Sequence, residues 1–540
     1  MTRRSLACAL VCTTLVAVLA QGGEAKSRAR SQAVAQPSDS TRVPLPDPVL
    51  APDMPRAMAV LDSARAAAAA DRHADAIRLY RRAIAFYPPL ADEIGVELGN
   101  QYTWADQPDS AMVWYRSHLA HHPDDADAMI GVARLTSWKD DLDGAERLYG
   151  EVLAADSTNL AARLGQAQAI NWSGRHRQAA ELYRGILADH PDAIEARAGL
   201  MQAERWMGRP DRAVAMADST PAPALDAIRS EIEHDQAPGV SYTFERNHDS
   251  DDIHRRYHTV KAGFSPDLMT RVSGVYGHSN FEQPARPDVS RNAFAGVLER
   301  RLSEAFALTA SAGYQWNSYD RSALGPQSYF LDEFNLFVFD VYGTLTPRDW
   351  TRIDFGVSRS SIDNPDAIFR GISRVELAAG LDRRLRSNLV WISSLEIAWY
   401  NDGNSSFGLG TRVLWEPLWR MPVKLNHRFS SSSGFAYYGF KHTNDNGYYD
   451  PRQYLSFYEE VALAMKFSPR VSARVAGRLS YDKENGDDWF VTGRFEASGR
   501  WAMWRGLGLS AGYTNSNSRL DSRPGYEIDG FYVTLDYLFW

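Results

Sequence analysis

The chain has 540 residues, a formal net charge of −8 and 23% charged residues. This length predicts two or three domains, and the modest charge gives no reason to expect nucleic acid as a partner. The mean hydropathy of −0.39 favours a soluble protein, because only a short N-terminal stretch is apolar enough to resemble a membrane helix. The aromatic residues are unevenly spread, however, with 12 in residues 1–237 and 50 in residues 238–540. We therefore expect the two parts to occupy different surroundings.

The N-terminus has the layout of a secretory signal peptide. A basic pair, Arg3 and Arg4, precedes an apolar stretch that ends in small residues. The predicted signal peptide covers residues 1–20, or reaches residue 25 if cleavage follows Ala25. A retained N-terminal anchor is the alternative.

The segment after the signal peptide is predicted to be a disordered linker. Residues 21–55 are rich in Pro, Ser and Ala and lack helical periodicity. Both cysteines, Cys8 and Cys12, leave with the signal peptide. The mature chain therefore has no disulfide and no Cys-ligated metal.

Residues 56–237 contain a repeat of about 34 residues. Three columns of residues keep this spacing: Ala76, Ala111, Ala145 and Ala179; Tyr80, Tyr115, Tyr149 and Tyr183; and Trp104, Trp138, Trp172 and Trp206. This period is typical of the tetratricopeptide repeat, a helix–turn–helix unit that buries its apolar face only by stacking. We expect an all-α solenoid, and we expect it in the periplasm.

Tetratricopeptide repeats bind partners along a concave groove, and the corresponding positions here are polar. The groove columns are Asn100, Arg134, Gln168 and Gln202; Thr103, Ser137, Asn171 and Arg205; and the adjacent Trp104, Trp138, Trp172 and Trp206. Polar side chains beside indole rings favour a periplasmic protein or a glycan as ligand. The alternative is that each Trp closes its own helix pair.

The histidines of the repeats show no metal-ligand spacing. His121 and His122 are adjacent, and His73 and His176 stand alone, so we expect all four on the solvated surface. No metal and no cofactor is predicted.

From residue 238 the sequence alternates with a period of two. In residues 489–501, Trp489, Val491 and Trp501 share one face, while Arg494 and Arg500 share the other. Three features are typical of outer-membrane barrels. The predicted strands are about 10–15 residues long, their ends carry aromatic residues, and short turns alternate with long loops such as 431–452. We predict an antiparallel transmembrane β-barrel of about 16 strands over residues 238–540, in a multidomain α+β protein. A secreted soluble all-β domain is the alternative.

The inward face of this barrel is predicted to be rich in arginine. The lumen candidates are Arg352, Arg374, Arg412, Arg428, Arg474, Arg478, Arg494 and Arg500. An excess of cations in a lumen favours anions or an acidic polymer. The alternative is that these charges pair with acidic residues across the lumen and merely fill it.

No catalytic motif occurs, neither G-x-S-x-G, H-E-x-x-H nor a P-loop, so an enzyme is not expected. The chain ends F-Y-V-T-L-D-Y-L-F-W, which resembles the terminal strand that the outer-membrane barrel assembly machinery recognises. The expected partners are therefore this machinery, outer-membrane lipid and a periplasmic ligand of the repeats.

The order of signal peptide, repeats and barrel resembles the YaiO family of outer-membrane proteins. The repeats carry the resemblance, from Tyr102-Thr103-Trp104 through Asn171-Trp172-Ser173 to Arg205-Trp206-Met207. The architecture is also similar to exopolysaccharide secretins. The resemblance implies a location in the outer membrane. The polar groove, the Trp column and the cation-rich lumen favour a pore, or a component, for export of a surface polysaccharide or another anionic polymer. The alternative function is a non-conducting anchor or receptor whose repeats scaffold periplasmic proteins.

Overall fold

The computed structural model describes residues 53–220, 222–324, 330–416, 428–444, 446–504, 506–517 and 527–539. The predicted signal peptide and nearly all of the predicted linker lie outside these residues. The described chain forms two compact units that divide between Leu200 and Met201. Within it, the helices are too short or too polar to cross a membrane.

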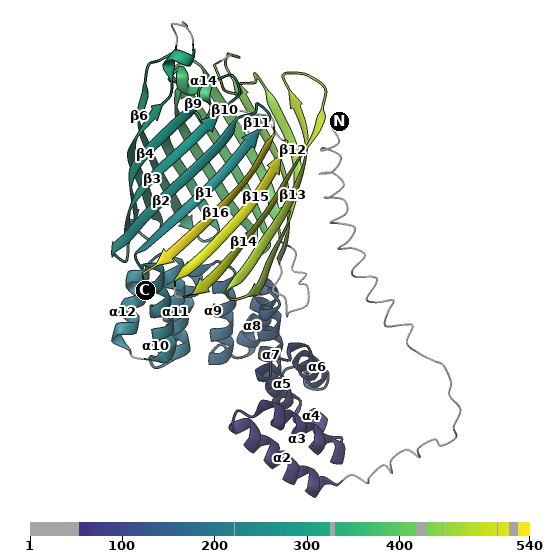
Figure 1. The fold of residues 1–540 in the computed structure, drawn as a ribbon. Helices are drawn as coiled ribbons and strands as arrows, with labels where there is room; N and C mark the ends of the chain where they lie inside the picture. The colour runs from purple at the N-terminus through teal and green to yellow at the C-terminus, as the bar shows by residue number, and fades with distance from the viewer. Residues whose placement is uncertain are drawn as a thin grey trace, which may run out of the picture. The chain divides into compact units, whose positions relative to one another are not determined.

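The first unit is a stack of antiparallel helix pairs (Figure 1). Its helices are α2 (Met54–Ala69), α3 (His73–Phe86), α4 (Leu90–Glu93), α5 (Gly95–Trp104), α6 (Pro108–Leu119), α7 (Ala126–Trp138), α8 (Leu142–Ala155), α9 (Leu160–Trp172) and α10 (His176–Asp189). Helix α11 (Ile194–Trp206) leads into the second unit. Each of α5, α7, α9 and α11 ends on a residue of the Trp column.

The repeat period places a tyrosine against a glycine of the next helix. An added Cβ at Gly131, Gly165 or Gly199 would lie within 2.5 Å of the ring of the tyrosine 16 positions earlier. Tyr115, Tyr149 and Tyr183 are at most 3% exposed. Burial raises the pKa of the Tyr149 hydroxyl to about 12, so this ring stays neutral in the stack. The tyrosine column therefore forms the contact between successive repeats.

The variant Gly165→Ala tests this contact. Its Cβ would lie 2.3 Å from Cζ of the buried Tyr149 ring, so we expect the free energy of unfolding to fall by about 1–3 kcal/mol. Gly185→Ala is the matched control, because its Cβ would come no closer than 3.9 Å to Arg163. The control should stabilise α10 by roughly 0.5–1 kcal/mol through its helix propensity. Thermal unfolding, followed by the circular dichroism of the helices, measures the stability of both variants. Equal unfolding midpoints for Gly165→Ala and Gly185→Ala would contradict this role of Tyr149.

The second unit contains the helices α12 (Pro210–Ser219) and α13 (Pro223–Asp235), the strands of a barrel and short helices between those strands. The strands are β1 (Gly239–Asp249), β2 (His254–Asp267), β3 (Thr270–Glu282), β4 (Val289–Arg301), β5 (Phe306–Ser318), β6 (Phe334–Arg348), β7 (Thr351–Ser361), β8 (Ser373–Arg386), β9 (Leu389–Tyr400), β10 (Ser405–Trp415), β11 (Arg428–Phe440), β12 (Tyr454–Ser468), β13 (Val471–Glu484), β14 (Phe490–Trp504), β15 (Leu507–Ser516) and β16 (Ile528–Leu538).

Every strand pairs antiparallel with its sequence neighbours, and β1 closes the barrel by pairing with β16. Figure 1 shows the strands tilted around this closed wall. Closure leaves no unpaired strand edge. The predicted fold class, a helical repeat region followed by an antiparallel barrel of 16 strands, is confirmed.

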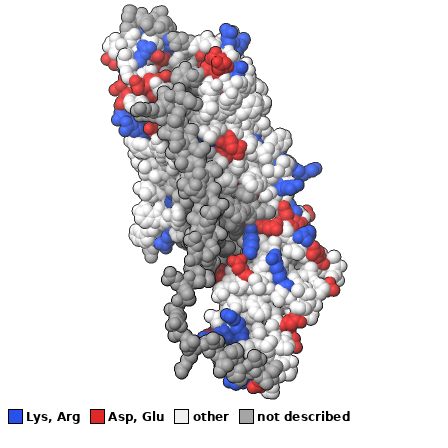
Figure 2. Space-filling model, turned by 90° about the vertical axis from the view of Figure 1, so that its right-hand side faces the viewer, with Lys and Arg blue, Asp and Glu red and all other residues white. Residues whose placement is uncertain are grey.

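The two faces of the barrel wall differ in chemistry. Large apolar side chains are exposed on the outward positions of most strands, including Tyr242, Phe294, Phe355, Leu395, Phe457, Trp501 and Val533. Much of the visible wall in Figure 2 carries neither basic nor acidic side chains. The inward positions between them hold polar residues, such as Ser480 and Thr492. The period of two in the sequence therefore separates an apolar exterior from a polar interior.

One predicted loop is wrong in its extent. The sequence indicated a loop over 431–452, but β11 continues to Phe440 and the connection covers only 441–453. A run of serines is typical of a loop, but Ser432 is buried on the inward face of β11. Ser431 and Ser433, on the outward positions of β11, are polar as well and bond Glu459, so the alternation was concealed.

Candidate functional site

The eight predicted lumen arginines lie on inward positions of the strands. Arg474 and Arg478, for example, alternate on β13 with the outward Val471 and Tyr481. On β7, Arg352 lies on the face opposite to the outward Phe355, and on β10, Arg412 lies on the face opposite to the outward Val413. The others occupy equivalent positions: Arg374 on β8, Arg428 on β11, and Arg494 and Arg500 on β14.

Most of these arginines pair with acidic residues along the wall. Arg352 lies 2.9 Å from Asp354, and Arg374 lies 3.1 Å from Glu376, each on its own strand. A second set of ion pairs joins β12, β13 and β14. Glu460 pairs with Arg474 and Arg478, and Glu496 pairs with Arg474 and Arg494. Because these ion pairs join residues on the same or neighbouring strands, they coat the wall without bridging the lumen. The ion pairs of Arg352, Arg374, Arg474, Arg478 and Arg494 described here therefore run along the wall.

A cation-rich pocket lies against the inner wall of β11–β15. It has a volume of about 510 Å³ and is lined by Arg428, Lys466, Arg474 and Arg500. Ser472, Ser498, Gly499 and Ser510 also line it, and these small side chains leave the space free. Within the described ranges, Arg428, Lys466 and also Arg412 have no ion pair, and Arg500 comes no closer than 3.9 Å to Asp536. The pocket therefore offers positive charge that the wall does not neutralise.

One mouth of the barrel is covered by the connection between β7 and β8. This segment, residues 362–372, contains the short helix α14 (Pro365–Phe369) and is called the mouth loop here. Ile368 and Phe369 are fully buried among inward residues such as Phe281 and Phe334. Ala367 is buried in a second cluster with Tyr400, Tyr438, Phe440 and Tyr454. The two clusters belong to different sets of strands, so α14 packs against both sets near this end of the barrel (Figure 1).

Polar contacts hold the mouth loop to the wall. The Arg255 Nε donates to the carbonyl oxygen of Asp363 at 2.8 Å, and the Tyr257 hydroxyl donates to its carboxylate at 3.0 Å. Arg291 pairs with the same carboxylate. Arg286 and Asp366 form a further ion pair of 2.9 Å. Asp363 is thus the point where the loop is fastened to β2 and β4.

None of these residues was predicted from the sequence. Asp363, Arg255 and Arg291 lie far apart in the chain, and only the closed barrel brings them together. The sequence Asn364-Pro365-Asp366 was a usable signal, because an Asn before Pro and an acidic residue marks a helix start. The following Ala-Ile-Phe is unusually apolar for an exposed loop.

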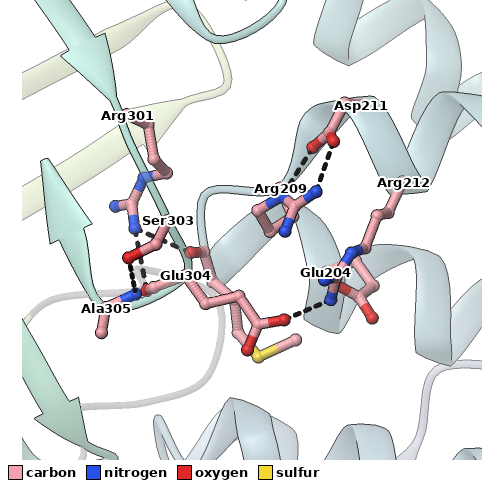
Figure 3. Close-up of polar contacts among 9 residues, drawn as sticks. Glu204, Arg209, Asp211, Arg212, Arg301, Ser303, Glu304 and Ala305 are labelled. Atoms are coloured by element: carbon pink, nitrogen blue, oxygen red, sulfur yellow. Dashed lines mark hydrogen bonds and ion pairs between the residues drawn. The ribbon is translucent and has the colours of Figure 1, made fainter.

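The last repeat turn contacts the turn between β4 and β5, and both belong to the second unit (Figure 3). Arg301 Nη1 donates to the carbonyl oxygen of Met207 at 2.9 Å. Arg212 pairs with Glu304 and also lies 3.5 Å from the buried Glu204. Beside this contact lies a pocket of about 700 Å³, lined by Trp206, Arg205, Arg271 and Arg300, among others. The last indole of the Trp column therefore opens onto a cationic rim of the barrel.

Gly208→Ala tests this contact. Gly208 has a φ of +74°, and its Cβ would lie 2.1 Å from Arg301 Nε. The left-handed backbone costs an alanine about 1 kcal/mol, and the Cβ also displaces the guanidinium. We expect faster amide hydrogen exchange in the 302–305 turn. Gly174→Ala has the same backbone penalty at a φ of +85° one repeat earlier and should leave that turn unchanged; faster exchange in both variants would contradict the contact.

The Trp column is exposed. Trp104, Trp138, Trp172 and Trp206 are 60%, 36%, 41% and 43% exposed, so a large part of each indole is open to a ligand. In the neighbouring column, the Arg134 guanidinium lies 6.0 Å from the Trp104 ring centroid, and Gln168 is exposed. Asn100 accepts from the Tyr115 hydroxyl at 2.7 Å, and Gln202 is half-buried.

The other predicted groove column needs correction. Thr103, Ser137 and Asn171 are at most 6% exposed, so they offer no surface to a ligand. Thr103 and Ser137 donate to backbone carbonyls of their own helices at 2.9 and 2.7 Å. Asn171 bonds the His176 ring at 2.8 Å, and Arg205 pairs with Asp235 at 2.7 Å. These side chains stabilise the helices because each finds its partner within the fold.

Comparisons with known proteins support the class of fold. Residues 173–230 match the family model of the tetratricopeptide repeat. The chain thus combines tetratricopeptide-type repeats with a closed antiparallel barrel of 16 strands. No curated protein matches the chain.

Three solved structures show a likeness to parts of the chain. A bacterial polysaccharide outer membrane secretin has 12% identity and a TM-score of 0.46, over 56% of this chain and 99% of its own. CdiB from Acinetobacter baumannii has 12% identity and a TM-score of 0.36, over 56% of this chain and 60% of its own. A tetratricopeptide repeat protein from Parabacteroides merdae has 18% identity and a TM-score of 0.31, over 33% of this chain and 72% of its own.

Proposed function

We propose that this protein is an outer-membrane pore of the YaiO family that exports an anionic polymer such as a surface polysaccharide, with its repeats in the periplasm. The observation that carries the proposal is the lumen pocket with Arg428, Lys466 and Arg500. Cations without acidic partners in a lumen attract anions and lower the barrier to their passage. The protein acts as a conduit and catalyses no reaction.

The apolar exterior supports a lipid surrounding for the barrel. Soluble monomers rarely expose contiguous apolar patches larger than a few hundred Å². Here exposed aromatic and aliphatic side chains recur on strands all around the wall. Outer-membrane lipid is therefore the proposed partner of this surface, and the barrel assembly machinery is the proposed route into it.

The repeats are proposed to recruit the polymer or a periplasmic protein that delivers it. Exposed indoles stack on sugar rings and on peptides. Trp206, at the end of the column, lines the pocket that also contains Arg271 and Arg300 of the barrel rim. A glycan that leaves the last repeat would meet positive charge before it enters the lumen.

An export assay in the native bacterium tests the function. We expect deletion of the gene to remove anionic polysaccharide from the cell surface, measured by binding of the cationic dye Alcian blue. The triple variant Arg428→Gln, Lys466→Gln and Arg500→Gln should lower export roughly tenfold, because the lumen loses its unneutralised cations. Trp138→Ala with Trp172→Ala should also lower export.

The matched control makes the same charge change outside the lumen pocket. Lys441→Gln and Arg452→Gln lie in the connection after β11, and Lys483→Gln lies over the outward Trp489. Heat-modifiable migration in gels checks that each barrel is assembled. Normal export by the lumen variant would contradict the proposal.

A second function, the non-conducting anchor or receptor, is favoured by the mouth loop. Its buried helix α14 covers one mouth of the barrel. A receptor needs no open lumen, whereas a pore needs this loop to move. Conductance with and without the loop separates the two functions.

A further inference from the structure

We propose that the repeats contain a binding site for a divalent transition metal, formed by Asp92, His118 and His122. A ligand atom from each of these three side chains lies within 4.8 Å of the others. Two imidazoles and a carboxylate are a ligand set that suits Zn²⁺ and Ni²⁺. A metal held by three protein ligands keeps further positions for water or for a partner's side chain.

The geometry directs both imidazoles at Asp92. The His118 and His122 rings stack with their centroids 4.6 Å apart and their planes at 29°. Nδ1 of His118 lies 2.8 Å from the Asp92 carbonyl oxygen, and Nε2 of His122 lies 3.0 Å from the Asp92 carboxylate. Because the stack fixes both rings, a metal would find its ligands largely preorganised.

The tautomer of His118 fits a metal ligand. A carbonyl oxygen only accepts hydrogen bonds, so Nδ1 of His118 carries the proton. Metal-binding histidines commonly donate their other ring N–H to a carbonyl in this way. Nε2 of His118 then bears a lone pair, unless a second proton is bound there, and it lies 3.1 Å from Asp125 Oδ2. A metal bound at Nε2 would therefore take the Asp125 carboxylate as a further oxygen ligand.

The surroundings favour a cation. His121 Nδ1 lies 3.2 Å from the other oxygen of the Asp92 carboxylate and is available as a fourth nitrogen. His118 is 7% exposed and His122 is 50% exposed, so the site has a buried floor and an open side for metal entry.

The sequence analysis placed His121 and His122 on the solvated surface and overlooked His118. Both exposed rings do reach solvent. The spacing of four between His118 and His122 brings them onto one side of the end of α6, and α4 supplies Asp92 from the preceding repeat. The prediction that the chain has no metal site missed this juxtaposition.

Calorimetric titration of the full-length, tag-free protein in detergent with Ni²⁺ and with Zn²⁺ tests the site. We expect one equivalent of metal to bind, and Co²⁺ to give visible ligand-field bands. His122→Ala and Asp92→Asn should each weaken binding on the order of tenfold or more. Both positions are largely exposed, so neither change should prevent folding.

His190→Ala is the matched control, because His190 is an exposed histidine of the repeats outside this cluster. It should bind metal as the native chain does. Zn²⁺ should raise the unfolding temperature of the native chain and of His190→Ala, but not that of His122→Ala. Absence of binding, or equal affinity in His122→Ala and the native chain, would overturn the proposal.

Discussion

Replacing residues 363–371 with a short Gly-Ser linker is expected to raise the single-channel conductance of the barrel roughly tenfold, since a lumen of 16 strands is wide enough for an aqueous channel. The change removes α14, whose Ala367, Ile368 and Phe369 are fully buried across the mouth. It also removes Asp363, which fastens the loop through Arg291 and Tyr257. Current through planar bilayers measures the effect.

The control for this experiment shortens a different connection at the same end of the barrel. Residues 485–488 are exposed, and they join β13 to β14. The same linker in their place should leave the conductance at the level of the native chain. Asp363→Asn is a milder variant that keeps the loop but weakens the ion pair to Arg291, and it should produce more frequent openings. A shortened mouth loop without any current would rule out the pore and favour the anchor.

Reversing the lumen charges is expected to reverse ion selectivity. With the mouth loop shortened, the barrel should prefer anions, because Arg428 and Lys466 have no acidic partner among the described residues and Arg500 has only Asp536, at 3.9 Å. Changing these three residues to Glu should shift the anion-to-cation permeability ratio by about tenfold or more, equivalent to ~1.4 kcal/mol. The sign of the reversal potential in a KCl gradient measures this.

A control reverses the charge of arginines outside the pocket that have acidic partners. It separates the effect of the pocket's own charge from that of the total charge of the lumen. Arg352→Glu, Arg374→Glu and Arg478→Glu change the total charge by the same amount, but these residues lie outside the pocket, each beside an acidic partner. These changes should alter selectivity less than the reversal at Arg428, Lys466 and Arg500. Equal effects at both sets would mean that the pocket has no special role.

The repeats and the barrel were predictable from the sequence for physical reasons. A stack of identical units repeats its contacts, so the Tyr and Trp columns reported the solenoid through their spacing alone. A barrel wall with lipid on one side and water on the other imposes a period of two, which residues 489–501 display. Mean hydropathy hid the barrel, because only every second residue contributes to the apolar exterior.

The details that determine function depend on contacts between distant residues. The sequence identified inward arginines but not their partners, since the pairing of Arg474 with Glu460 and Glu496 depends on the register of three strands. It gave no sign that Phe369 is buried, because that burial depends on residues of distant strands such as Phe281 and Phe334. It assigned Thr103 and Asn171 to the groove, although the rotation of each helix turns them inward.

Current block by a charged polymer tests the central claim most directly. Polygalacturonate, an anionic polysaccharide, would be added to the loop-shortened barrel in a planar bilayer, from either side, and compared with neutral dextran of similar length. We expect polygalacturonate to interrupt the current in events that lengthen at low salt, because screening of the Arg428 and Lys466 charges is then weakest. Dextran should cause few and brief events at any salt concentration. Equal block by both polymers, or none by polygalacturonate, would contradict the assignment of the lumen to an anionic chain.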